Sequence, residues 1–283
     1  MLTPASQAQP SRCAVVLASL TLAIATAASG RADAATWPPG PYPAADRVDE
    51  AREFAEQSSG TVAFAVIDGD GDVHGLDEDR QFSSASISKV LLLAGELRRL
   101  RAGGESLDEG TRSLLEAMIT VSDNDAASTI YAGVGDEGMS EVAERAGMSS
   151  FEITPGYWGG SQVTAADLAR FFFRLNRNLV GPDGRYARGL LANITGSQRW
   201  GIPEAVGGDW KVYFKGGWRP PATAETSGPV THQAALLRHS TGRRVGLAIL
   251  TDQSPGRSTY GILEGITSRL LAEAPEPTRW PAP

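Results

Sequence analysis

The sequence predicts a mixed α/β fold of the α+β type, in which an antiparallel sheet is flanked by helices from the two chain ends and interrupted by an inserted all-helical domain. Segments rich in β-branched and aromatic residues cluster at 61–77 and 209–252, helix formers dominate between them, and an amphipathic segment lies near each end. A chain of 283 residues can bury one large core or two smaller ones. We expect residues 35–85 and 199–283 to form the sheet domain, and residues 86–198 to form the helical domain.

The first 34 residues are typical of a secretory signal peptide. Arg12 is the only early charge, residues 15–28 are small and apolar, and residues 32–34 read Ala-Asp-Ala, which fits a cleavage site. We expect cleavage near Ala34 and a secreted or periplasmic protein; the alternative is an uncleaved anchor. Cys13, the single cysteine, precedes the apolar stretch, so the mature chain would hold no disulfide.

The individual elements follow from periodicity and turn residues. Residues 46–57 have helical periodicity, and the β-rich segments 61–68 and 73–77 enclose the turn sequence Gly-Asp-Gly-Asp, which predicts a hairpin. Further helices are expected at 86–101, 108–119, 123–131, 138–146, 165–175, 185–194 and 258–274. Further strands are expected at 209–217, 230–239 and 243–252.

Charge and residue usage exclude several classes of partner. The net charge is −7 and no basic stripe is interleaved with aromatic residues, so we expect no nucleic-acid partner. The three histidines lack metal-ligand spacing. The aspartates at 68, 70 and 72 do not form a calcium loop, because Val73 stands where such a loop needs glycine. We therefore expect no metal and no cofactor, and we take the chain to be a monomer.

The first candidate for chemistry is the pair Ser86 and Lys89, at the start of the apolar segment 86–101. Residues three apart share a helix face, and the first turn of a helix has free backbone N–H groups. This arrangement can present a nucleophilic hydroxyl, an amine that accepts its proton, and a donor for an oxyanion. The alternative is a capping serine followed by an incidental lysine.

Two further motifs could complete a site. Ser-Asp-Asn at 122–124 lies between two expected helices, where by itself it is typical of an N-cap. Lys-Gly-Gly at 215–217 ends an expected strand, where two glycines allow a ligand backbone to approach; the alternative is a turn that ends the strand.

The three motifs in this order resemble the signature of the penicillin-recognising serine hydrolases, and class A β-lactamases in particular, which carry S-x-x-K, S-D-N and K-T-G. The third motif is K-G-G in this chain. The resemblance spans about 46–274, since S-x-x-K follows the hairpin, S-D-N lies in the helical block, and K-G-G ends the next strand. It implies a β-lactamase/transpeptidase-like fold.

The resemblance also implies the roles of the catalytic residues. Ser86 would be the acylated nucleophile, Lys89 would deprotonate it directly or through a partner, and Ser122 would pass a proton to the leaving nitrogen. The backbone N–H groups of Ser86 and Trp218 would form the oxyanion hole. Lys215 would favour a lowered pKa of Lys89 through like-charge repulsion.

Other residues are implied to bind the substrate. Asn124 would bind its amide, Lys215 would help to place a carboxylate, and Gly217 would allow the close approach at the strand edge. A cationic side chain is also expected near the following strand, and Arg219 or His232 could meet a carboxylate. The alternative for His232 is an ordinary strand residue.

The chain departs from the class A pattern after the S-D-N motif. Class A enzymes deacylate with a loop glutamate, whereas residues 148–163 are short and glycine-rich and contain Glu152 as their single acid. Glu152 comes early in the segment, so we interpret it as structural; the alternative is a displaced base.

We therefore expect a secreted serine hydrolase that forms an acyl-enzyme on Ser86 with an amide-, lactam- or ester-type substrate, either a small molecule or a cell-wall peptide. β-Lactam turnover would be weak. The alternatives are an esterase or a hydrolase similar to D-alanyl-D-alanine peptidases, and a non-catalytic cell-wall-binding relative.

Overall fold

A five-stranded antiparallel sheet organises the part of the chain that this computed structural model describes, which is residue 1 and residues 42–271 except 59, 68, 70, 220–229 and 253–258. The strand order is β2-β1-β7-β6-β5. The strands are β1 (Thr61–Ile67), β2 (Val73–Leu76), β5 (Trp210–Arg219), β6 (Val230–His239) and β7 (Arg244–Asp252). The predicted fold class, the predicted strands and the pairing of the first two strands are therefore confirmed.

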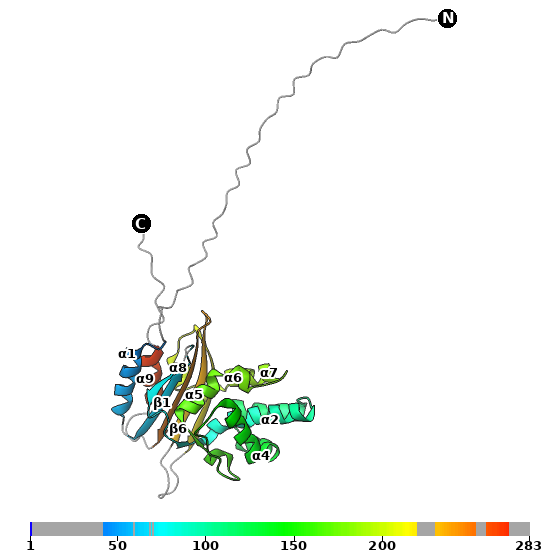
Figure 1. Ribbon diagram of the computed structural model, residues 1–283, viewed down its shortest axis with the longest axis horizontal. Coiled ribbons are helices and arrows are strands. Elements are labelled where there is room, and N and C mark those ends of the chain that lie inside the picture. Colours follow the sequence, from blue (N-terminus) through cyan, green and yellow to red (C-terminus); the bar gives the residue numbers. More distant parts are fainter. Residues whose placement is uncertain are drawn as a thin grey trace. The chain divides into compact units, whose positions relative to one another are not determined.

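The helices from the two chain ends cover one face of the sheet. In Figure 1, α1 (Ala45–Glu56) and α9 (Thr259–Leu271) lie side by side there. Alternate residues of β1, such as Phe64 and Val66, join a core with these helices, while their neighbours Ala63 and Ala65 join a second core. Because both faces are covered, the central strands are continuous apolar runs.

The second face of the sheet packs against α5 (Ala165–Phe173), which contacts β1, β6 and β7. The helix approaches β7 very closely at Gly246, where a Cβ atom would lie 2.4 Å from the carbonyl oxygen of Ala169. This glycine therefore fixes the depth to which α5 packs.

The helical part of the chain surrounds α2 (Lys89–Gly103), whose first nine residues are all buried. The 3₁₀ turn η1 (Ala85–Ser88) leads directly into it. The remaining helices here are α3 (Glu109–Thr120), α4 (Asn124–Ala146), α6 (Leu175–Asn178) and α7 (Gly184–Ala192). The helices expected at 123–131 and 138–146 are confirmed as the two helical parts of α4, which are separated at Gly135, whose φ of 66° and ψ of −179° are non-helical.

Several short elements were not predicted. Strands β3 (Phe82–Ser83) and β4 (Gln162–Val163) pair with each other, and Glu152 forms a single bridge with Gln162. The others are η2 (Trp158–Gly160), η3 (Gly196–Gln198) and α8 (Ile202–Ala205). The small sheet ties the segment before Ser86 to the loop at 151–163.

Some predictions fall outside the described residues: the signal peptide at 1–34 with Cys13, and part of the turn at 68–72. In the part of the chain that is described, no helix combines the length and apolar character needed to cross a bilayer. The division into a sheet domain and a helical domain stays a prediction.

Candidate active site

Ser86 lies on η1, half-buried, at the point where the chain enters α2. Residues i and i+3 are eclipsed in a 3₁₀ turn, so Lys89 follows on the same side. The preceding residue, Ala85, has a φ of 47°, which is uncommon for a residue other than glycine. Such backbone strain is concentrated at functional sites and persists where the surrounding structure holds it.

Lys89 is fully buried and its ammonium group is surrounded by oxygen acceptors. Nζ donates to the carbonyl oxygen of Ser122 at 2.6 Å and to Asn124 Oδ1 at 2.8 Å, and it lies 3.2 Å from Ser122 Oγ. Burial lowers the pKa of Lys89 to about 8, against the opposing effect of the Asp123 carboxylate. A fraction of Lys89 is therefore neutral near pH 7 and able to accept a proton.

Within the Ser-Asp-Asn motif, the aspartate caps a helix, and the serine and the asparagine face Lys89. The Asp123 side chain caps α4 by accepting from the N–H of Ala126 at 2.7 Å. Ser122 and Asn124, on either side of it, face Lys89 instead. Ser122 also has a positive φ of 61°. The N-cap interpretation therefore holds for Asp123, whereas Ser122 and Asn124 are directed towards the lysine.

Lys215 brings a second buried amine to the same serine. Its Nζ donates to Ser122 Oγ at 2.9 Å and to the carbonyl oxygen of Gly216 at 2.9 Å. Burial, and then the charge of Lys89, hold the pKa of Lys215 well below its ordinary value. One hydroxyl thus joins two amines, and their mutual repulsion disfavours the state in which both are charged.

The end of β5 lies against the segment that carries Ser86. A Cβ atom on Gly217 would lie 2.9 Å from the backbone nitrogen of Ile87 and 3.1 Å from that of Ser86. Only glycine allows this approach without a shift of backbone. Trp218 follows at the rim, 41% exposed, with its ring centroid 5.6 Å from Lys215 Nζ.

The two candidate cations differ in their surroundings. His232 is fully buried; its Nδ1 accepts from the N–H of Thr251 at 3.0 Å, which leaves Nε2–H to donate to the carbonyl oxygen of Ser83 at 3.1 Å. Burial lowers the pKa of His232 to about 4. Both nitrogens are engaged, which favours the alternative of an ordinary strand residue.

Arg219 donates from Nη1 to Ser83 Oγ at 3.2 Å, and both residues line a cavity of about 270 Å³ together with Gln162 and Asp252. Its Nε and Nη2 have no hydrogen-bond partner among the residues described. Of the two candidates, Arg219 is therefore the one whose side-chain N–H groups could donate to a substrate carboxylate.

Glu152 lies in the loop at 151–163, and among the described residues no hydrogen bond joins it to Lys89. Its side chain is exposed, and its backbone exchanges hydrogen bonds with Gln162 at 3.1 and 2.7 Å. The residue that reaches the site is Trp158, whose ring centroid lies 5.0 Å from Lys89 Nζ. Sequence reasoning missed Trp158, although a tryptophan before two glycines in a shortened loop was a usable signal.

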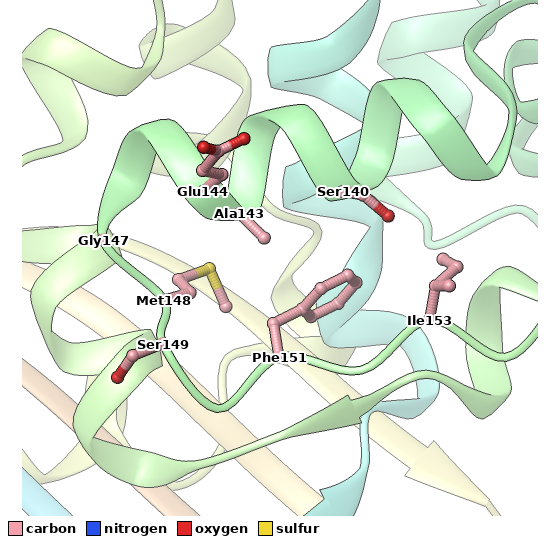
Figure 2. Close-up of a pocket in the computed structure, with 8 residues that line it drawn as sticks. All are labelled: Ser140, Ala143, Glu144, Gly147, Met148, Ser149, Phe151 and Ile153. Carbon is pink, nitrogen blue, oxygen red and sulfur yellow. The ribbon is translucent and has the colours of Figure 1, made fainter.

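A separate hollow of about 500 Å³ lies between the C-terminal half of α4 and the segment that follows it. Figure 2 shows Ala143, Met148, Phe151 and Ile153 around it. No predicted catalytic residue lines this hollow, so it is distinct from the cluster at Lys89.

Several solved structures share the fold of this chain. The chain is similar to a class A β-lactamase from Bacteroides cellulosilyticus (TM-score 0.72, 15% identity, covering 82% of this chain and 98% of that one). It is also similar to PBP-A (TM-score 0.68, 17% identity, 83% and 97%) and to a β-lactamase from Sphaerobacter thermophilus (TM-score 0.65, 18% identity, 80% and 94%). No curated protein matches the chain.

The sequence model of the β-lactamase enzyme family matches residues 110–273, and the chain belongs to that family. The match includes Ser122 and Lys215 and begins after Ser86 and Lys89.

Proposed function

We propose that the protein is a serine hydrolase that forms an acyl-enzyme on Ser86 with an amide-, lactam- or ester-type substrate. The observation that carries the proposal is the chain of contacts from Lys215 through Ser122 Oγ to Lys89, which follows Ser86 on the same turn. Two buried amines with lowered pKa values beside a serine at a strained backbone position have no evident structural purpose.

Acylation would proceed as follows. The neutral amine of Lys89 takes the proton of Ser86 as Oγ bonds to the substrate carbonyl carbon, and the N–H groups of Ser86 and Trp218 stabilise the oxyanion. Ser122 Oγ, which lies between the two lysines, delivers its proton to the leaving nitrogen or oxygen as the bond from that atom to the carbonyl carbon breaks, and it regains a proton from the Lys89 ammonium. Asn124 and Arg219 would bind the amide and a carboxylate of the substrate.

Deacylation is expected to be slow. It requires a water activated by a base, and a positioned general base is worth about 10²–10⁴-fold in rate. The exposed position of Glu152 supports its structural interpretation. β-Lactams would therefore acylate the protein and be turned over weakly. The second candidate is a hydrolase that acts on cell-wall peptides, for which the same nucleophile and proton-transfer residues would serve. A signal peptide removed near Ala34 would deliver either enzyme outside the cytoplasm.

Intact-mass measurement after exposure to a penicillin or a serine-reactive fluorophosphonate tests the proposal. One covalent adduct should form on the wild type and be absent from Ser86→Ala. An adduct that persists in Ser86→Ala would place the nucleophile elsewhere. No adduct with either reagent on a folded wild type would favour a non-catalytic relative.

A further inference from the structure

Trp158 is held over Lys89 by contacts on several sides. Its ring centroid lies 5.0 Å from Lys89 Nζ, and its Nε1–H is 3.4 Å from Ser128 Oγ on α4. Its carbonyl oxygen accepts from Ser84 Oγ at 3.4 Å, so the residue joins α4 to the segment that precedes the nucleophile. The side chain also packs against the helical core. The indole is thus fixed in place beside the amine.

Hydrolysis of an ester on Ser86 has definite requirements. A bond forms between the water oxygen and the acyl carbonyl carbon, the bond from that carbon to Ser86 Oγ breaks, one water proton passes to a base, and Oγ regains a proton. Lys89 is the amine closest in sequence to the ester, so it would have to accept the water proton. A neutral amine has two N–H groups and one lone pair.

The surroundings of Lys89 leave little room for a water in that role. The carbonyl oxygen of Ser122, Asn124 Oδ1 and Ser122 Oγ all lie within hydrogen-bond distance of Nζ and occupy one side of it. The indole of Trp158 covers another side of the nitrogen. A water that approaches Lys89 from the loop would have to displace the ring.

We propose that Trp158 shields Lys89 and the acyl ester from water, and that this positioning residue makes the acyl-enzyme long-lived. The inference rests on the proposed acylation of Ser86 and adds the reason for its slow hydrolysis. Trp158 would thereby separate the two half-reactions: Ser86, three residues before Lys89, would approach the amine from its own helical turn, whereas water would have to come past the indole.

The experiment measures acylation and deacylation separately, by intact mass over time after mixing with a penicillin and after removal of the excess. Trp158→Ala should shorten the lifetime of the adduct by about tenfold or more, within the range of general-base assistance, while acylation changes much less. Trp158→Phe retains a ring and should resemble the wild type. Tyr157→Ala is the matched control, because it removes the exposed neighbouring ring of the same loop.

A second readout separates shielding from a merely structural role. In Trp158→Ala the deacylation rate should rise with pH as Lys89 loses its proton, whereas the wild-type rate should stay low. Trp158→Asn provides a smaller polar side chain if the alanine variant does not fold. An unchanged adduct lifetime in folded Trp158 variants that acylate normally would overturn the inference. No adduct on the wild type would instead overturn the proposed function.

Discussion

Replacement of Gly217 by alanine tests the contact between β5 and the nucleophile segment. A Cβ atom there would meet three backbone atoms: the nitrogen of Ile87 at 2.9 Å, and the carbonyl oxygen of Ser84 and the nitrogen of Ser86, both at 3.1 Å. Backbone atoms cannot rotate away as a flexible side chain would. The strand and η1 must therefore separate by a few tenths of an ångström.

The expected effects follow from this shift. Overpacking of this kind typically costs about 1–3 kcal/mol in the free energy of unfolding. For a domain of this size that corresponds to a fall of about 2–12 °C in melting temperature. The shift also moves the N–H groups of Ser86 and Trp218 relative to each other. Since small misplacements of reacting groups can cost up to about 10²-fold, we expect acylation to slow by about ten- to a hundredfold.

Differential scanning fluorimetry and the intact-mass time course measure the two effects on the same samples. Gly208→Ala is the control, because a Cβ at that exposed turn position meets no atom within 4 Å. It should leave both the melting temperature and the acylation rate near the wild-type values. Wild-type stability together with wild-type acylation in Gly217→Ala would refute the close approach and the oxyanion geometry built on it.

Three further predictions concern the titration of Lys89 and the role of Glu152. Burial lowers the pKa of Lys89 from 10.5 to about 8, so the unfolded chain holds more protons than the folded protein between these pH values. The free energy of unfolding of the wild type should therefore increase, relative to that of Lys89→Met, as the pH rises from about 8 to about 10. Urea titrations at each pH measure this difference. The acylation rate should likewise rise through about pH 8 in stopped-flow measurements, and a flat profile would contradict a lysine base. Nitrocefin should give a burst of about one equivalent and then a slow phase that Glu152→Gln leaves nearly unchanged; fast turnover that collapses in Glu152→Gln would identify Glu152 as the base.

The sequence predicted the elements whose signal is repeated over many residues. The strands of 61–76 and 210–252 carry long apolar β-rich runs, and motif order located the lysines and the Ser-Asp-Asn turn. It could not predict β3 and β4, because two-residue strands have no periodicity and form where their surroundings bring them together. The tryptophan before two glycines indicates an unusual loop, but its contact with Lys89 could not be predicted, since the contact depends on the path of a loop some 70 residues away.

The features that would make this site reactive also lower the stability of the folded protein. A buried lysine is costly, and here two of them lie next to one hydroxyl. Burial in turn makes an amine at Lys89 available as a base near neutral pH, because it lowers the pKa. The positive φ angles of Ala85 and Ser122 add strain at the same place. The apolar core that buries the first nine residues of α2 must therefore supply the free energy of folding that the site itself costs.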